Sequence, residues 1–347
     1  MTKKILVTGG SGFIGSEAIR TLTSLGYNVF NIDKLTYASS NESLELVNKN
    51  NYTFYEGDIA DEVTISNFIK EISPECILNF AAESHVDRSI EDADDFINTN
   101  ILGTYNLLKY SSEILSNLIS DNDFRFIHIS TDEVYGSLGF DDEPFNEDSS
   151  FKPNSPYSAS KASSDMLVRS WIKTYNFPAI ITHSSNNYGP WQFPEKLIPR
   201  SVLCALNEEP IQIYGDGSNI RDWIFVEDNV RAIIELMKSG NIGETYNIGS
   251  ENEVSNIGLV KEICNILDDI KPRSNGSYSD LIVFVEDRPG HDLRYAIDIN
   301  KITSTTSWRP IKNVHEGLKI SIQWMIDNRL WLLKKATDKR RLGLKKK

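Results

Sequence analysis

The sequence predicts an α/β fold, in which a doubly wound parallel sheet is joined to a smaller, interleaved C-terminal domain. Two observations predict it. Short apolar runs alternate with helix-compatible segments over the first half of the chain, and polar residues follow the ends of several runs. The runs lie at residues 4–8, 27–32, 52–56, 76–80, 126–130 and 179–183. Such alternation implies right-handed crossovers and therefore a parallel sheet.

The first apolar run breaks into a glycine-rich turn, GGSGFIG at residues 9–15, before a helical pattern. Gly9, Gly12 and Gly15 have G-x-x-G-x-x-G spacing, in which small residues permit a tight turn and a close approach to a pyrophosphate at the helix N-terminus. The next run ends at Asp33, 18 residues beyond Gly15. An acidic residue at this distance accepts hydrogen bonds from an adenosine ribose and repels a 2′-phosphate. The first domain is therefore predicted to be a Rossmann domain that binds NAD rather than NADP.

A cluster of reactive side chains follows the fifth run. Thr131, Asp132 and Glu133 supply a hydroxyl and two adjacent carboxylates, and Tyr157 and Lys161 follow four residues apart. On a helix, positions i and i+4 share a face, so the Lys161 ammonium can lie below the Tyr157 phenol and favour its ionised form. Taken alone, such a pair is typical of any exposed helix, and the acidic pair is typical of a helix N-terminus. The nucleotide-binding turn upstream favours the catalytic interpretation, with Tyr157 as a base near neutral pH.

Further polar residues are expected at the same edge of the sheet, because ligands of doubly wound sheets bind beyond the carboxyl ends of the strands. Asp58, residues 81–85 and residues 183–187 all follow strand-like runs, as the catalytic cluster does. His128 lies inside an apolar run and is predicted to be a packed core residue. His85 follows a run and is the better site candidate.

Composition and charge exclude several classes of protein. The three cysteines are scattered and form no Cys/His cluster, which predicts a reducing compartment, no disulfides and no metal site. The N-terminal apolar run is too short for a signal peptide, and no stretch approaches a membrane span of about 20 apolar residues. The tail at 334–347 holds eight Lys or Arg and one Asp, a charge of +7, so residues 1–333 carry −20 within a net charge of −13. The negative charge of residues 1–333 argues against nucleic-acid binding. We expect a cytoplasmic protein that does not associate with a membrane.

Helical segments at 100–115 and 157–175 carry apolar residues on more than one face. Pairing across a two-fold axis would bury these residues in a four-helix bundle, so a homodimer is expected. The organisation changes after about residue 187, where an amphipathic helix, a strand at 211–214 and a helix at 226–237 are predicted. A strand at 245–248 is expected to return to the main sheet.

Six motifs make the sequence resemble the extended short-chain dehydrogenase/reductase family and, within it, the nucleotide-sugar 4,6-dehydratases, over residues 4 to about 328. The motifs are DKLTYA at 33–38, AAESHVDRS at 81–89, STDEVYG at 130–136, SSNNYGP at 184–190, FPEKLIP at 193–199 and DRPGHD at 287–292. The Asp-Glu pair after the threonine separates the dehydratases from epimerases and decarboxylases that use the same cofactor. In one departure, Ser39 follows Ala38 where the family commonly has a glycine.

The resemblance implies a lyase reaction with no net redox change. Tyr157 would take the proton of the sugar 4-hydroxyl while hydride passes from C4 to NAD, and Lys161 would lower the Tyr157 pKa and hold the nicotinamide ribose. Thr131 would hydrogen-bond near the sugar 4-oxygen. Glu133 would remove the C5 proton and Asp132, held protonated, would donate to the departing 6-hydroxyl. Return of the hydride to C6 gives a 4-keto-6-deoxy sugar.

The change of organisation and the charge of the tail give the expected domain boundaries, and the motifs together with the resemblance give the expected binding residues. The expected units are an NAD-binding Rossmann domain at 1–186 with a return near 225–248, a nucleotide-sugar-binding domain at 187–333 and the basic tail at 334–347. The expected cofactor-binding residues are Gly9, Gly12, Phe13, Ile14, Gly15, Asp33, Lys34, Thr36, Asp58, Ile59, Ala81, Ala82, Tyr157 and Lys161. The expected substrate-binding residues are Ser84, His85, Thr131, Asn186, Asn187, Lys196, Leu197, Tyr214, Arg221, Asn256, Arg288 and His291.

The expected substrate is dTDP-glucose. Three alternatives remain open. The enzyme could dehydrate UDP-glucose or another nucleotide sugar, because the base is recognised by few contacts. It could be a C4 epimerase, although that reaction has no need of Asp132 or Glu133. A catalytically silent NAD-binding sensor would be expected to lack the tyrosine, the lysine or the acidic pair, and all are present.

Overall fold

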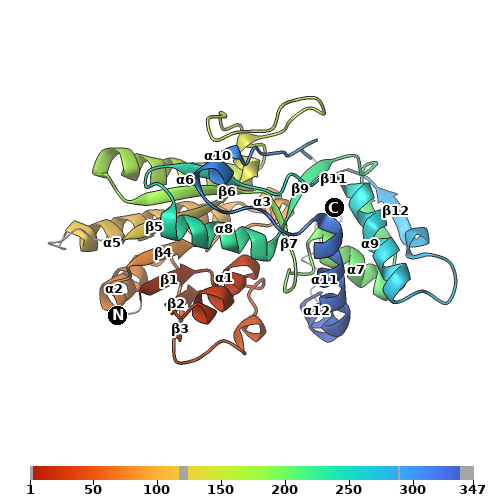
Figure 1. The fold of residues 1–347 in the computed structure, drawn as a ribbon, viewed down its shortest axis with the longest axis horizontal. Helices are drawn as coiled ribbons and strands as arrows, with labels where there is room; N and C mark the ends of the chain where they lie inside the picture. The colour runs from red at the N-terminus through yellow and green to blue at the C-terminus, as the bar shows by residue number, and fades with distance from the viewer. Residues whose placement is uncertain (1–2, 117–123, 288–289, 337–347) are drawn as a thin grey trace.

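The computed structural model of the protein describes residues 3–116, 124–287 and 290–336. The predicted site residue Arg288 and most of the basic tail lie outside the described residues. A seven-stranded sheet of order β10-β6-β5-β4-β1-β2-β3 forms the centre of the fold (Figure 1). All six pairings between its neighbouring strands are parallel, so the predicted α/β fold is confirmed. The strands are β1 (Lys4–Thr8), β2 (Asn28–Asp33), β3 (Tyr52–Glu56), β4 (Cys76–Asn79), β5 (Arg125–Thr131), β6 (Ala179–Ser184) and β10 (Thr245–Ile248).

Each face of this sheet is covered by helices, because successive side chains of a strand point to opposite faces. In β1, Ile5 and Val7 enter a core with one set of helices, and Leu6 enters a separate core with the other set. The first set comprises α1 (Phe13–Ser24), α8 (Val226–Ser239) and α10 (Asn300–Thr305). The second set comprises α2 (Glu62–Ile72), α5 (Thr104–Ser116) and α6 (Pro156–Tyr175). This burial fixes the ends of β1, β4 and β5, where the candidate site lies.

Helix α6 begins at a position that its own sequence specifies. The Ser155 side chain accepts a hydrogen bond from the Ser158 amide, the Ser158 hydroxyl accepts one from the Ser155 amide, and Pro156 occupies the first helical position. Such a capping box fixes the start of a helix, and proline at this position needs no N–H partner. The start of α6 therefore places Tyr157 in its first turn and Lys161 one turn later.

A second group of elements has its own apolar core and lies at the right of Figure 1. Its strands form two small sheets, one of order β11-β9-β7 and one of β12 paired with β8. The strands are β7 (Asn186–Tyr188), β8 (Ile211–Tyr214), β9 (Ile220–Phe225), β11 (Glu253–Ser255) and β12 (Ile282–Val285). The helices are α7 (Leu197–Leu206), α9 (Asn256–Ile270), α11 (Val314–Asp327) and α12 (Arg329–Ala336).

Short helices lie in the connections of both groups of elements. They are η1 (Asn41–Leu44), α3 (Val86–Glu91), α4 (Asp94–Phe96), η2 (Ile97–Gly103), η3 (Asp132–Tyr135) and η4 (Tyr278–Leu281). The segment η2 is a π-helix that leads into α5, and a Cβ atom on Gly103 would lie 2.5 Å from the Ile59 side chain. A larger residue at that point would require the Ile59 side chain to move. Among the described residues, no helix combines the length and the apolar character needed to cross a membrane.

Candidate active site

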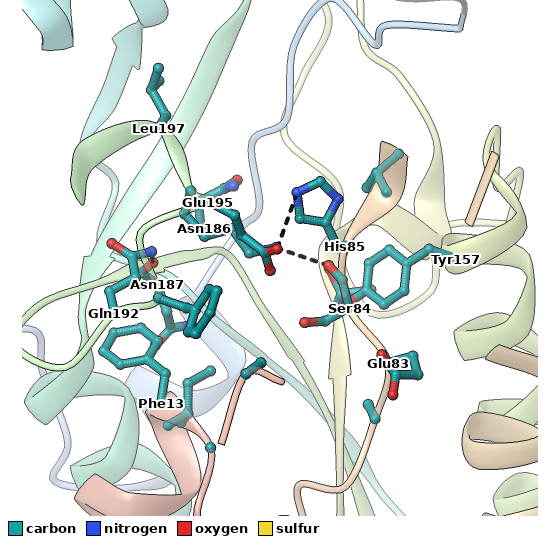
Figure 2. Close-up of a pocket in the computed structure, with 18 of the residues that line it drawn as sticks. Phe13, Glu83, Ser84, His85, Tyr157, Asn186, Asn187, Gln192, Glu195 and Leu197 are labelled. Atoms are coloured by element: carbon teal, nitrogen blue, oxygen red, sulfur yellow. Dashed lines mark hydrogen bonds and ion pairs between the residues drawn. The ribbon is translucent and has the colours of Figure 1, made fainter. Parts of the chain in front are cut away.

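A cleft of about 540 Å³ runs along the carboxyl ends of the sheet strands and continues between the two groups of elements. It collects residues from distant parts of the sequence, including the glycine-rich turn, the acidic pair and the loop after β7. Every predicted site residue that the structure describes lines this cleft. Figure 2 shows Phe13 of α1 on one side of it and Tyr157 of α6 on the other.

The glycine-rich turn approaches neighbouring backbone too closely for any side chain. Gly9 has φ +66°, and a Cβ atom there would lie 2.7 Å from the backbone of Ala81, while one on Gly15 would lie 2.4 Å from the Gly9 carbonyl oxygen. The amides of Ser11 and Leu35 donate to the Asp33 carboxylate at 2.9 and 2.8 Å. The turn and the acidic residue are thus held together at the N-terminus of α1, where backbone N–H groups favour a phosphate.

The Tyr157 and Lys161 side chains are both buried beside β5. The Lys161 ammonium donates to the carbonyl oxygen of Ile129 at 2.8 Å. Burial lowers the pKa of Lys161 to about 8, although Asp165 opposes the shift. The Tyr157 phenol differs from the expectation, because burial raises its pKa and the negative charge of Glu133 raises it further, whereas a hydrogen bond with Thr131 lowers it.

The acidic pair occupies the short helix that follows β5. The Thr131 side chain caps this helix by accepting from the Glu133 amide at 3.3 Å, and its hydroxyl donates to Asp132 Oδ1 at 3.3 Å. Burial raises the pKa of Asp132 well above its usual value, and the charges of Glu133 and Asp222 raise it further. The second oxygen, Oδ2, is buried with no hydrogen-bond partner among the described residues. A neutral carboxylic acid, able to donate a proton into the cleft, fits this environment.

Three side-chain amides on the opposite wall present acceptors without partners. The amide oxygens of Asn186, Asn187 and Gln192 line the cleft and are buried with no hydrogen-bond partner in the described part of the chain. Buried polar atoms are normally paired, because an unpaired one costs about 1–3 kcal/mol. A ligand that carries hydroxyl or N–H groups would satisfy them.

Charged and aromatic side chains line the outer part of the cleft. The Arg221 guanidinium lies 4.3 Å from the centre of the Tyr295 ring and donates to the Asp292 carbonyl oxygen at 2.9 Å. The rings of Tyr214 and His291 meet edge to face, with centroids 6.3 Å apart. The Arg221 charge and the Tyr214 ring are thus held in fixed positions, as recognition of a phosphate and of a flat base requires.

The sequence is similar over nearly its whole length to proteins of known family. Residues 6–321 match the family model described as GDP-mannose 4,6 dehydratase. A dTDP-glucose 4,6-dehydratase of Neisseria meningitidis is 50% identical over 336 residues, which cover 95% of each chain. The chain belongs to the GDP-mannose 4,6 dehydratase family. The predicted resemblance to nucleotide-sugar 4,6-dehydratases is thereby confirmed.

Solved structures of related proteins share the whole architecture of this family member. A dTDP-glucose 4,6-dehydratase of Streptomyces venezuelae, crystallised with NAD and TYD bound, has a TM-score of 0.87 at 38% identity, with 96% of this chain and 99% of that chain covered. A UDP-glucose 4-epimerase of Thermotoga maritima has a TM-score of 0.83 at 28% identity and covers 94% of this chain and 99% of that one. Because dehydratases and epimerases share the fold, the site residues must decide between them.

Several residues around the site were missed by the sequence analysis. Asn100 donates to the Glu83 carbonyl oxygen at 3.1 Å and to the Ser160 hydroxyl at 2.8 Å, so it joins the loop after β4 to α6. Glu195 lies 3.7 Å from His85 across the cleft, and Figure 2 shows the two side chains facing each other. Glu195 and His85 each lie within a motif quoted above, but only the fold shows that they pair.

A buried polar network beneath Lys161 was also missed. The Asp165 carboxylate contacts His128 at 3.2 Å and His183 at 3.0 Å, and the Ser130 hydroxyl donates to it at 2.9 Å. His128 is fully buried, as predicted, and burial lowers its pKa to about 4. The spacing of Asp165, four residues after Lys161 on α6, could have indicated that it lies on the same helix face.

Proposed function

We propose that the protein is a dTDP-glucose 4,6-dehydratase that converts dTDP-glucose into dTDP-4-keto-6-deoxyglucose and water with NAD as its resident cofactor. The observation that carries the proposal is the acidic pair. Asp132 is buried in an environment that raises its pKa well above the usual value, directly beside Glu133 and within the same cleft as Tyr157. Elimination of water needs a base that acts on the C5 proton and an acid that acts on the 6-hydroxyl, in addition to the base at the 4-hydroxyl. Epimerisation at C4 has no need of that second acid and base.

The residues of the cleft fit NAD. The glycine-rich turn leaves space for a pyrophosphate, and Asp33 lies where an adenosine ribose would hydrogen-bond. Lys34, Thr36, Asp58 and Ile59 line the same end of the cleft. When bound, NAD supplies a hydride acceptor for C4 and a hydride donor for C6.

Tyr157 acts as the base that removes the proton from the sugar 4-hydroxyl. Lys161 lies one helical turn away, and its ammonium, held by the Ile129 carbonyl oxygen, favours the phenolate electrostatically. Thr131 contributes a hydrogen bond that lowers the Tyr157 pKa. This opposes the effect of burial and prepares the phenol for proton transfer.

Glu133 and Asp132 then carry out the elimination. A C4 ketone acidifies the C5 proton, and Glu133 removes it. Asp132 donates its proton to the departing 6-hydroxyl, because burial and the neighbouring carboxylates raise its pKa and favour the neutral form. The two residues therefore perform different roles because their environments differ.

The nucleotide half of the substrate is assigned to the outer cleft. Arg221 and Lys196 supply positive charge for the diphosphate, and Tyr214 packs against the base. The unpartnered amide oxygens of Asn186 and Asn187 accept from sugar or ribose hydroxyls. Ser84, His85, Leu197, Asn256 and His291 complete the lining, and Arg288 is assigned here from its motif alone.

Two copies of the chain are proposed to pair through α5, α6 and η2. Large apolar side chains are exposed on these elements, with Ile97 51%, Tyr105 36% and Met166 49% exposed. A four-helix bundle formed by two copies would bury them. A sedimentation measurement that gives twice the chain mass supports this arrangement, and a monomer at micromolar concentration refutes it.

The domain boundaries and the location are proposed on similar grounds. Separate apolar cores support a Rossmann domain at 1–186 with β10 returned to its sheet, and a substrate domain at 187–333. Cys76, Cys204 and Cys264 are all buried free thiols, as is typical of cytoplasmic proteins.

The test is incubation of the purified protein with dTDP-glucose and, separately, UDP-glucose, without added NAD. The formation of 4-keto-6-deoxy products is followed by their alkali-induced absorbance, and the loss of water by mass spectrometry. Dehydration of dTDP-glucose in preference to UDP-glucose supports the proposal. Preference for UDP-glucose would support the proposed reaction but replace dTDP-glucose by UDP-glucose as the substrate. A product that retains the water and is inverted at C4 would favour the epimerase, whose fold the chain shares.

A further inference from the structure

The C-terminal helix α12 reaches back to the loop that follows β2. The Trp331 indole donates to the Ser40 hydroxyl at 3.1 Å, and the Lys335 ammonium donates to the Ser39 carbonyl oxygen at 2.8 Å. Lys334 pairs with the Glu42 carboxylate at 3.1 Å. We call these contacts, made by Trp331, Lys334 and Lys335 to residues 39–42, the C-terminal clasp.

The loop held by the clasp is hydrogen-bonded to the Asp33 carboxylate, the group proposed to bind the adenosine ribose. The Ser39 hydroxyl donates to Asp33 Oδ1 at 3.0 Å, and the Ser40 amide donates to the Ser11 carbonyl oxygen at 2.8 Å. The loop is thus bonded to both parts of the dinucleotide signature, the acidic residue and the glycine-rich turn. Ser39 itself lines the cleft.

The other side of the clasp is anchored in the second apolar core. Leu332 is fully buried there. The rings of Trp191, Trp324 and Trp331 pack together, with centroids between 4.8 and 5.5 Å apart. Trp191 directly precedes Gln192, which lines the substrate side of the cleft. The clasp therefore connects the substrate side of the molecule to the adenosine end of the cofactor site.

We propose that the C-terminal clasp slows the release of NAD by holding the loop at residues 39–42 over the adenosine end of the cleft. The inference rests on the proposed NAD site. Ser39 bonds Asp33 and lines the cleft, so a movement of this loop would open the adenosine end, and the clasp adds hydrogen bonds and an ion pair that oppose that movement. A retained cofactor suits a reaction that regenerates NAD in every cycle.

Electrostatics supports the clasp as a persistent feature at neutral pH. Although partial burial opposes the shift, hydrogen bonds from its own amide, from Ser40 and from Lys334 lower the pKa of Glu42 to about 2. Glu42 is therefore ionised throughout the neutral range, and its carboxylate lies 3.1 Å from the Lys334 ammonium and 4.0 Å from that of Lys335. The Lys334 side chain is 73% exposed and its ion pair is weak, whereas Lys335 is 17% exposed and bonds a backbone carbonyl oxygen. Lys335 and Trp331 are expected to contribute most.

The test measures NAD release from the full-length protein. NAD-loaded protein is freed of excess cofactor, and an auxiliary NAD-reducing dehydrogenase traps each released molecule as NADH, whose absorbance is followed. The variant combines Trp331→Phe with Lys335→Met. The first change keeps an aromatic ring and loses the indole N–H, and the second keeps an unbranched apolar side chain and loses the ammonium charge. The matched control is Lys319→Met, because Lys319 is exposed on the neighbouring helix α11. Release from the variant should be at least about fivefold faster, as expected for the loss of a hydrogen bond worth about 1 kcal/mol.

The outcomes separate this inference from the proposed function. An unchanged release rate in the variant overturns the clasp, as does equal acceleration in the Lys319→Met control. Failure of the wild type to bind NAD at all overturns the proposed cofactor and the clasp with it. If the double variant does not fold, Lys335→Met alone tests the bond to the Ser39 carbonyl oxygen. Added salt should speed NAD release from the wild type, because salt screens the ion pair between Glu42 and Lys334. The effect of salt should be smaller in Glu42→Gln, which lacks this ion pair.

Discussion

Replacement of Asp132 by asparagine tests the elimination step most sharply. Asparagine resembles a protonated aspartic acid in shape but has no proton to give. The wild-type Oδ2 has no partner to lose among the described residues, and the Thr131 hydroxyl can still donate to the amide oxygen at the position of Oδ1. The change in folding stability at acidic pH should therefore stay within about 1 kcal/mol. Turnover should fall about 10²- to 10⁴-fold, the usual contribution of a general acid.

The sign of the pH dependence provides a second check. Because the folded-state pKa of Asp132 is raised above 3.8, the folded protein holds a proton that the unfolded chain has already lost as pH rises beyond that value. The wild type consequently loses stability with rising pH through this window, and Asp132→Asn does not. Thermal melts at several pH values should show the variant gaining in relative stability from acidic to neutral pH.

The assay separates C4 oxidation from elimination in a single turnover. With Asp132→Asn, the C4 ketone should form and the bound cofactor should stay reduced, because no 5,6-alkene accepts the hydride. Glu133→Gln, the matched change on the neighbouring residue, should in addition abolish exchange of the C5 proton with solvent. Wild-type turnover in Asp132→Asn, or a block before C4 oxidation, would refute the role assigned to Asp132.

Three further changes probe other parts of the site. Tyr157→Phe should slow C4 oxidation about 10²- to 10⁴-fold because the base is lost, and pre-steady-state cofactor reduction at normal rate would contradict this. Burial lowers the pKa of Lys161 from 10.5 to about 8, so folding stability rises between these pH values, where only the unfolded chain keeps the proton. Lys161→Met should then be up to about 3 kcal/mol more stable than wild type in melts at pH 7, with an advantage that shrinks above pH 8, although it turns over poorly. Arg221→Lys keeps the charge but loses the stacking on Tyr295, so steady-state kinetics should show KM raised about tenfold with kcat nearly unchanged.

Much of the fold could be predicted because its strands are short apolar runs closed by polar residues. β3 has the predicted bounds, and Asp33 ends β2 as expected. The glycine turn, the acidic pair and the Tyr157–Lys161 pair line one cleft because parallel strands all end at the same edge of the sheet. Local sequence therefore contains most of the information about the catalytic half of the site.

Long-range polar pairing could not be predicted. His183 and Asp165 lie on a strand and a helix whose separate patterns are those of ordinary buried elements, and only the packing of α6 on β6 brings them to 3.0 Å. The Tyr157 pKa was expected to fall beside Lys161, but burial and the carboxylate of Glu133 raise it. The clasp joins Ser39 to Lys335 across nearly the whole chain, a contact for which no local pattern exists.

The most direct test of the account follows a label through the reaction. The enzyme is given dTDP-glucose with deuterium at C4, and the product is examined by mass spectrometry and NMR. The account predicts that deuterium moves to C6 of a 4-keto-6-deoxy product and that one solvent proton enters C5. Deuterium retained at C4 of a product that has lost no water would show an epimerase, and deuterium lost to solvent would contradict hydride transfer within one active site.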